Sequence, residues 1–196
     1  MKSDIKNHFK KVDPILFNAL NEIGDIRQMT EREPKKFFQT LCREIICQQL
    51  SNASGDAIHN RFLLLFPRQP ISKRLVKITD KALRETGMSW AKARYIKDLA
   101  TKLENKEVNL NNLSLLSDDK VIEELTKIKG IGQWTAKMFL VSALGREDVF
   151  SYEDIHLVRS MERVYKMPNI SREQAESIAL KWSPYRTWAS RVLWNL

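Results

Sequence analysis

The sequence contains few cysteines, and this shortage excludes several classes of protein. Its 196 residues include two cysteines, Cys42 and Cys47. They are five positions apart within one predicted helix and therefore lie on different faces, which disfavours a disulfide between them. Two thiols also fall short of the four that an iron–sulfur cluster or a four-cysteine metal site needs. We therefore expect an intracellular protein with reduced thiols.

Long apolar runs and strand patterns are missing as well. No apolar stretch approaches the roughly 18 residues that a membrane-spanning helix requires. The first residues, Met1 to Lys6, lack the apolar core of a signal peptide. We find no alternation typical of strands, no tandem repeat and no long linker. These absences predict a helical protein that has no membrane partner.

Acidic residues are outnumbered by basic ones. Lys and Arg total 33 against 24 Asp and Glu, which gives a formal net charge of +9. Such an excess favours polyanionic partners and association that weakens with added salt. A basic protein that is merely soluble would have the same charge, so motifs have to identify the partner.

Apolar residues recur at helical spacing along most of the chain, and capping residues such as Ser89 and Ser117 precede several of these segments. The segments predicted to be helical are 14–23, 35–50, 51–66, 71–78, 79–87, 90–103, 118–128, 133–144, 154–165, 171–181 and 184–194. Residues 105–114 are rich in turn formers and are predicted to be a loop. The predicted fold class is all-α, with short connections.

Two helical lobes are expected from the position of these segments in the chain. Residues 36–150 are predicted to form a central helical domain that contains a helix-hairpin-helix motif. Residues 1–35 and 151–196 are predicted to pack together as a second lobe. An active-site cleft is expected between the two lobes.

The most informative motif is Gly-Ile-Gly at residues 130–132, between two helical segments. Two glycines one residue apart allow a hairpin that other residues would strain. The hairpin would direct the first free N–H groups of the second helix outward, and such a helix N-terminus binds phosphate. A plain helix–turn is the alternative. The groups predicted to bind a nucleic-acid backbone are the N–H groups of Gly130, Gly132 and Thr135 and the side chains of Lys129 and Lys137.

A pair of carboxylates, Glu153 and Asp154, follows the hairpin. We predict Asp154 to be catalytic, because an ionised carboxylate stabilises a developing cation or activates water. Adjacent helical residues face different ways, so only one of the two is expected to point into the cleft. The alternative is that both simply cap the following helix. His156 is expected to be structural.

Two further groups of residues suit a protein that handles bases. Large apolar side chains near the hairpin, the acid and the C-terminus either belong to the core or line a slot for a flat base. These are Trp134, Met138, Ile155 and Trp194. Gln49 lies at a predicted helix end and is either an ordinary polar terminus or a wedge that fills the gap left by an extruded base.

Taken together, these residues resemble the helix-hairpin-helix DNA glycosylase superfamily. Its pattern, Leu-x-x-(Ile/Phe)-x-Gly-(Ile/Val)-Gly with a catalytic Asp further along, corresponds to residues 125–132 and Asp154. The likeness to the 3-methyladenine DNA glycosylase II branch is narrower and covers the chain from about residue 35 to its end. It is carried by the segments 130–136, 148–150, 48–51 and 182–189.

The resemblance implies an enzyme of base excision repair that acts on double-stranded DNA with a damaged base. Such an enzyme flips an alkylated purine nucleotide out of the duplex and hydrolyses its N-glycosidic bond. Asp154 would serve the chemistry, Gln49 would plug the duplex, and Trp134 and Trp194 would line the base pocket. Met138 and Ile155 stand where this branch can offer aromatic rings, which weakens the expected stacking on a cationic base.

The resemblance also bears on cofactors. It implies a monovalent cation, Na⁺ or K⁺, held by the backbone carbonyls of Thr126, Ile128 and Ile131. No other cofactor and no iron–sulfur cluster are expected. Branches that also cleave the DNA backbone carry a Schiff-base lysine where this chain has Trp134, so we predict a monofunctional hydrolase.

Two alternatives remain open at this point. One is a glycosylase for a different lesion, such as oxidised guanine or a mismatched pyrimidine. The other is a non-catalytic module that binds DNA through the same hairpin. Nothing in the sequence requires a dimer, so a monomer is expected, located with DNA inside the cell.

Overall fold

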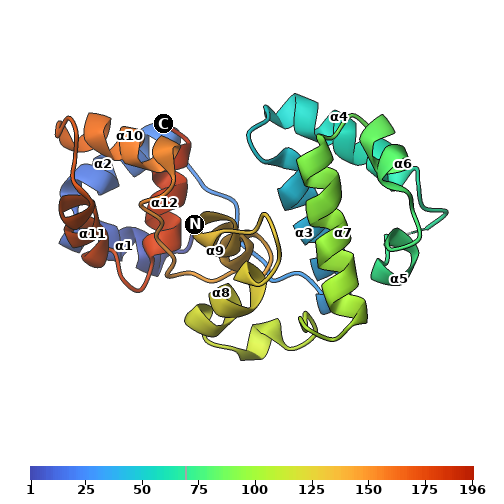
Figure 1. Ribbon diagram of the computed structural model, residues 1–196. Coiled ribbons are helices and arrows are strands. Elements are labelled where there is room, and N and C mark those ends of the chain that lie inside the picture. The colour runs from blue at the N-terminus through green and yellow to red at the C-terminus, as the bar shows by residue number, and fades with distance from the viewer. Residues whose placement is uncertain (69) are drawn as a thin grey trace. The chain divides into compact units, whose positions relative to one another are not determined.

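The computed structural model describes residues 1–68 and 70–196, and their regular structure is helical (Figure 1). Twelve α-helices and two 3-10 helices lie in these ranges, which contain no strand. The predicted all-α class is therefore confirmed. None of the helices in this part of the chain is both long enough and apolar enough to cross a bilayer.

The chain divides into two compact units, residues 32–139 and residues 1–31 together with 140–196. The predicted central domain, 36–150, therefore begins four residues later and ends eleven residues later than the observed unit. Residues 140–150 belong with the chain ends because hydrogen bonds tie them to the last helix. The N–H of Val149 donates to Thr187 Oγ1 at 2.9 Å, and Asp148 pairs with Arg186 at 2.8 Å.

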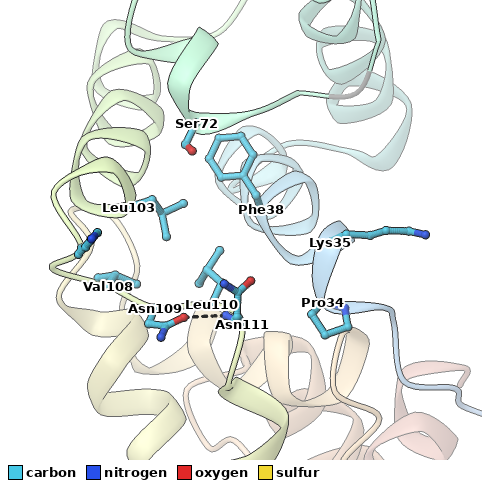
Figure 2. Close-up of a pocket in the computed structure, with 10 residues that line it drawn as sticks. Pro34, Lys35, Phe38, Ser72, Leu103, Val108, Asn109, Leu110 and Asn111 are labelled. Atoms are coloured by element: carbon cyan, nitrogen blue, oxygen red, sulfur yellow. Dashed lines mark hydrogen bonds between the residues drawn. The ribbon is translucent and has the colours of Figure 1, made fainter.

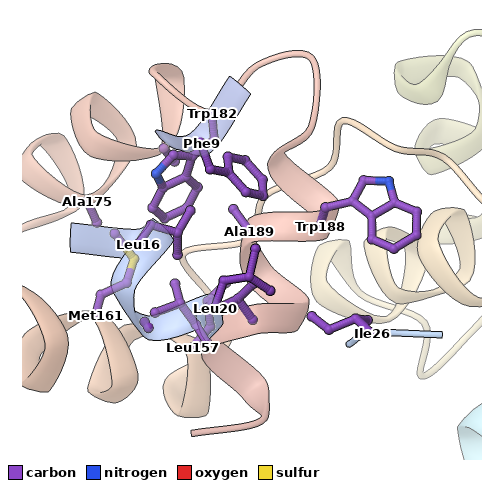
Figure 3. Packing of buried hydrophobic residues seen from close by; sticks show 14 of the residues in the cluster. Phe9, Leu16, Leu20, Ile26, Leu157, Met161, Ala175, Trp182, Trp188 and Ala189 are labelled. Carbon is purple, nitrogen blue, oxygen red and sulfur yellow. The ribbon is translucent and has the colours of Figure 1, made fainter. Parts of the chain in front are cut away.

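The unit built from the chain ends has a large apolar core (Figure 3). Its helices are α1 (Ser3–Val12), α2 (Pro14–Ile23), α10 (Ile155–Tyr165), α11 (Arg172–Leu180) and α12 (Arg186–Trp194). Phe9, Leu157 and Trp182 are completely buried in this core. Asp13 joins the two ends of the chain, because its carboxylate accepts hydrogen bonds from Trp182 Nε1 at 2.8 Å and from the Tyr165 hydroxyl at 2.6 Å.

The central unit contains the predicted hairpin. Its elements are η1 (Pro34–Lys36), α3 (Phe37–Cys47), α4 (Asn52–Leu63), α5 (Ser72–Leu75), α6 (Asp80–Glu85), α7 (Trp90–Glu104), η2 (Leu113–Leu115), α8 (Asp118–Thr126) and most of α9 (Gln133–Ser142). The rings of Phe37 and Phe139 meet edge to face with centroids 5.3 Å apart, which fixes the first residue of α3 against α9.

The predicted helices form, with ends that differ by a few residues. The hydroxyl of Ser89 caps α7 as expected, and the hydroxyl of Ser51 caps α4. Ser117 takes the N-cap position of α8 without a side-chain hydrogen bond, so the expected cap bond is wrong. Helix α1 was not predicted, because Ile5 and Phe9 are its only buried residues and give a single apolar pair in a polar segment.

Candidate functional site

The hairpin between α8 and α9 forms as the two glycines predict. Gly130 has φ +83°, in the left-handed region, and reverses the chain there. The carbonyl of Gly132 accepts the N–H of Ala136 at 3.0 Å, which begins the hydrogen-bond ladder of α9. The residues before Ala136 form the first turn of α9, where a helix presents its N–H groups. Both glycines are exposed, so this helix N-terminus faces solvent.

Space is left open in front of that helix. A Cβ atom at residue 132 would have no neighbouring atom within 4 Å, so packing does not require a glycine there. Lys129 is exposed beside the turn, and Lys137 is half-buried one turn into α9. Thr135 is 4% exposed, and its side chain faces the protein rather than solvent. The surface is suited to an anion that approaches the backbone closely.

Helix α7 supports the hairpin from beneath. The ring of Tyr95 lies against Gly130, where an added Cβ would come within 2.2 Å of its Cδ2 atom. Asp98 accepts the N–H of Lys129 at 2.8 Å, and the ammonium of Lys102 donates to the carbonyl of Lys127. Sequence reasoning missed these supports, because an Asp and a Lys four residues apart on a helix usually form an ordinary surface pair.

The hairpin perturbs the pKa of Asp98. Partial burial of its carboxyl group acts to raise the pKa. The hydrogen bond from Lys129 N–H, together with the hydrogen bond and charge of Lys102 at 2.9 Å, outweighs burial and lowers the pKa below 3.8. The carboxylate is therefore held ionised beneath the turn.

The turn between α3 and α4 lies against the same hairpin. Gln48 Nε2 donates to the carbonyl of Gly130 at 2.9 Å and to Thr135 Oγ1 at 3.2 Å. Lys92 Nζ donates to the carbonyls of Ile46 and Gln48 at 2.9 and 2.6 Å and so closes the C-terminus of α3. The next residue, Gln49, is exposed and has φ +56°, which is unusual for a residue with a side chain.

The carbonyls predicted to hold a monovalent cation lie at the end of α8, for Thr126, and in the loop that follows, for Ile128 and Ile131. The carbonyl of Ile128 accepts the N–H of Ile131 at 3.1 Å, which leaves its second lone pair for another partner. Neutral carbonyl oxygens are suitable ligands for a hard cation. Thr126, Ile128 and Ile131 therefore fit the expected ion by chemical type. Among the described residues there is no cluster of three or more His, Cys, Asp or Glu side chains that would hold a different metal.

In the unit formed by the chain ends, Asp154 caps α10. Its Oδ1 accepts the N–H of Leu157 at 3.0 Å, and the residue is 6% exposed. A carboxylate at this position is oriented by the first turn of the helix and stabilised by its dipole. The capping role considered from the sequence is thus present, and it is compatible with a chemical role.

Glu153 is directed to different partners. Its Oε1 pairs with Arg172 at 3.1 Å, and its Oε2 accepts the hydroxyl of Ser151 at 2.8 Å. His156 is exposed on the first turn of α10. Of the two neighbouring carboxylates, Asp154 is the one that is buried and held at the helix N-terminus, whereas Glu153 is exposed.

The predicted base-pocket residues differ in exposure. Trp134 is 36% exposed and Ile155 is 65% exposed, so both offer apolar surface to solvent. Met138 is half-buried in α9. Trp194 packs against the core of the chain-end unit, so at least part of its indole is structural. Trp134 and Met138 belong to the central unit, and Ile155 and Trp194 belong to the chain-end unit.

A separate cavity of about 490 Å³ lies in the central unit (Figure 2). It is lined by Phe38 at the start of α3, Leu103 near the end of α7 and Leu110 in the loop that follows α7. Gln48 and Lys92 are at the opposite ends of these two helices. None of the residues predicted to act on DNA lines this cavity, so it is distinct from the candidate site.

The chain is similar to known proteins along most of its length. Residues 42–184 match the model of the HhH-GPD superfamily of base excision DNA repair proteins. A DNA-3-methyladenine glycosylase from Saccharomyces cerevisiae is 31% identical, over 96% of this chain and 77% of the relative. DNA-3-methyladenine glycosylase 1 from Schizosaccharomyces pombe is 28% identical, over 96% of this chain and 84% of the relative.

Solved structures share the fold over nearly the whole chain. A DNA-3-methyladenine glycosidase from Bacillus halodurans is 33% identical, with a TM-score of 0.83, over 98% of this chain and 88% of that one. The 3-methyladenine DNA glycosylase of Schizosaccharomyces pombe, solved in complex with abasic DNA, is 25% identical, with a TM-score of 0.84. That similarity covers 98% of this chain and 95% of that one.

Proposed function

Because the chain belongs to the HhH-GPD superfamily of base excision DNA repair proteins, we propose that it is a monofunctional DNA glycosylase for alkylated purines of the 3-methyladenine type. The observation that carries the proposal is the exposed N-terminus of α9, with open space at Gly132 and a rigid support from α7. The names of the similar glycosylases from two yeasts and from Bacillus halodurans support the substrate class.

The hairpin is proposed to bind the DNA backbone at a phosphate. The donors are the N–H groups of Gly130, Gly132 and Thr135, and the lysines at 129 and 137 add positive charge. A grip of this kind is independent of base sequence and suits a protein that searches duplex DNA. Gln49 is proposed to enter the duplex, where its amide fills the gap left by the extruded nucleotide.

Asp154 is proposed to serve the chemical step. The bond between C1′ of the deoxyribose and the base nitrogen breaks, and its electron pair leaves with the base. The resulting cationic sugar is stabilised by the ionised carboxylate, and water then adds its oxygen to C1′ and gives up a proton that a carboxylate can accept. An alkylated purine already carries positive charge, so its departure needs little help from an acid.

Trp134, Met138, Ile155 and Trp194 are proposed to line the base pocket. Aromatic faces attract a cationic base, at about 1–3 kcal/mol for each stacked ring. Trp134 also decides the type of enzyme. An indole cannot form the imine that backbone cleavage requires, so the product is an abasic site in an intact strand.

Thr126, Ile128 and Ile131 would hold Na⁺ or K⁺ through their carbonyls, and such an ion would add positive charge beside the DNA phosphate. No other cofactor is part of the proposal. The proposed partner is duplex DNA that contains a damaged base, and the protein is proposed to work as a monomer where the cell keeps its DNA.

A panel of lesion-bearing duplexes tests the proposal. We expect release of 3-methyladenine and, more slowly, of 7-methylguanine or hypoxanthine. Release of oxidised guanine or of a mismatched pyrimidine alone would assign a different lesion. Binding to every duplex without release of any base would identify a non-catalytic DNA-binding module. Borohydride added during the reaction should trap no protein–DNA adduct, and a trapped adduct would contradict the monofunctional assignment.

A further inference from the structure

One side chain joins the turn that carries Gln49 to the hairpin. Gln48 directs both hydrogens of its amide to the hairpin, one to the carbonyl of Gly130 at 2.9 Å and one to Thr135 Oγ1 at 3.2 Å. These partners lie 82 and 87 residues further along the chain. Both contacts are within the central unit, and Thr135 is buried beneath the first turn of α9.

The backbone of the same turn is fixed from a second direction. Gln48 is the C-cap of α3, with φ −49° and ψ 131°. Lys92, from α7, donates from its ammonium to the carbonyls of Ile46 and Gln48. These two bonds hold the backbone where it leaves α3, and Gln49 follows in a left-handed conformation with its side chain exposed.

Helix α7 contacts both the turn that follows α3 and the hairpin. Its first turn carries Lys92, which closes the turn at Gln48, and its later turns carry Tyr95 and Asp98, which hold the hairpin. The direct link through the amide of Gln48 completes a closed loop of contacts. A closed loop is stiffer than two parts that share one support, because neither part can shift alone.

We infer that Gln48 is a positioning residue that couples Gln49 to the phosphate-binding hairpin, so that the two engage DNA as one rigid piece. Gln48 itself need not touch a base. Its amide fixes the distance between the phosphate held at α9 and the side chain that enters the duplex, so less conformational freedom is lost on binding. This inference rests on the proposed function for the role of Gln49 as the inserted residue.

Three substitutions of Gln48 separate its hydrogen bonds from its shape. Gln48→Ala removes the side chain, Gln48→Met keeps its length without donors, and Gln48→Glu keeps its shape but presents oxygens to the carbonyl of Gly130. The matched control is Gln28→Ala, which truncates an exposed glutamine in the chain-end unit. Affinity for a duplex with a stable abasic analogue is measured by fluorescence anisotropy, and melting temperature is measured in parallel.

The decisive measurement is a double-mutant cycle with Gln49→Ala. We expect Gln48→Met and Gln49→Ala each to weaken binding to the abasic duplex about 10-fold, since two hydrogen bonds or one inserted side chain are lost. The double variant should be no weaker than either single variant, because Gln48 acts only through Gln49. Losses that multiply, or Gln48 variants that bind like wild type, would overturn the inference.

A milder substitution tests the same link in case the Gln48 variants are unstable. Thr135→Val removes one of the two acceptors and keeps the side-chain size, so it should show a smaller loss with the same non-additivity. Fluorescence of 2-aminopurine beside the lesion reports base extrusion in the same samples. None of these readouts requires base release. If no base is released but the effects of the Gln48 and Gln49 substitutions are non-additive, the proposed function alone is rejected. If excision is normal but the affinity losses of the Gln48 and Gln49 variants multiply, the role of Gln48 alone is rejected.

Discussion

The ring of Tyr95 fills the space in which a side chain on Gly130 would begin. A Cβ atom added at residue 130 would lie 2.2 Å from Cδ2 of the ring and 2.5 Å from its Cγ. The backbone of Gly130 is also left-handed, with φ +83°. Glycine is therefore required at residue 130 for two separate reasons, the packing of the ring and the backbone conformation. The contact between Tyr95 and Gly130 also fixes the hairpin against α7.

We therefore expect Gly130→Ala to destabilise the protein. The left-handed conformation costs roughly 1–2 kcal/mol for a residue with a Cβ, and overpacking against the ring typically costs about 1–3 kcal/mol more. Chemical denaturation should show the loss in the free energy of unfolding. In the Tyr95→Ala background, Gly130→Ala should cost only the backbone part, and no cost in that background would mean that the backbone conformation carries none.

Gly132 should behave in the opposite way. No atom lies within 4 Å of a Cβ at this position, and its backbone is not left-handed, so Gly132→Ala is expected to melt within a few degrees of wild type. Gly132→Asp adds a negative charge where we propose that a phosphate binds. Its affinity for duplex DNA of any sequence should fall by at least 10-fold at low salt. Unchanged affinity of the Asp variant would remove the phosphate-binding role.

Gln49→Gly should separate stability from function. The left-handed conformation at φ +56° suits glycine better than glutamine, and this gain offsets the larger freedom of glycine in the unfolded chain. We expect a melting temperature that is unchanged or higher. Base release from lesion-bearing duplex should fall, because nothing fills the gap left by the extruded nucleotide. A variant that excises at the wild-type rate would contradict the wedge assignment.

The lowered pKa of Asp98 predicts how the stability of the protein changes with acid pH. Burial acts to raise the pKa of Asp98. The hydrogen bonds from Lys129 N–H and the Lys102 ammonium lower the pKa by more, so in the folded protein it is below the ordinary value of 3.8. Such a group stabilises the fold above pH 3.8, and this stabilisation is lost as the pH falls through the lower folded value. The difference in unfolding free energy between wild type and Asp98→Asn should be constant near neutral pH and shrink below about pH 4. A difference that stays constant to pH 3 would show that the carboxylate does not stabilise the hairpin.

The sequence predicts the local parts of the site and not its supports. The Gly-Ile-Gly spacing is sufficient to predict the hairpin, but only Gly130 uses the conformational freedom of glycine, because the backbone of Gly132 is not left-handed. The bond from Gln48 to Gly130 spans 82 residues and the bond from Asp98 to Lys129 spans 31. Such contacts depend on how the helices pack, which periodicity alone does not specify.

Helix α1 shows the same limit in the fold. Its burial depends on Ile5 and Phe9 meeting helices from the other end of the chain, so its own sequence contains little apolar signal. Asp13 was not identified either, although its carboxylate joins Trp182 to the start of α2. Both features form only when residues far apart in the sequence come together.

Asp154→Asn is the sharpest test of the proposed chemistry. Asn is as good an N-cap as Asp, and its side-chain oxygen can still accept the N–H of Leu157. The free energy of unfolding should therefore change by less than about 1 kcal/mol. Excision of 3-methyladenine should fall by about 100-fold or more, because a neutral amide neither stabilises the sugar cation nor accepts a proton.

The matched control for that variant is Glu153→Gln, which removes the neighbouring charge instead. Glu153 is engaged by Arg172 and Ser151, so its loss should weaken that contact and leave excision within a few-fold of wild type. Affinity for a duplex with an abasic analogue should be close to wild type in both variants, since neither residue belongs to the hairpin. An active Asp154→Asn variant, or an inactive Glu153→Gln variant, would move the catalytic assignment from one carboxylate to its neighbour or to a residue elsewhere.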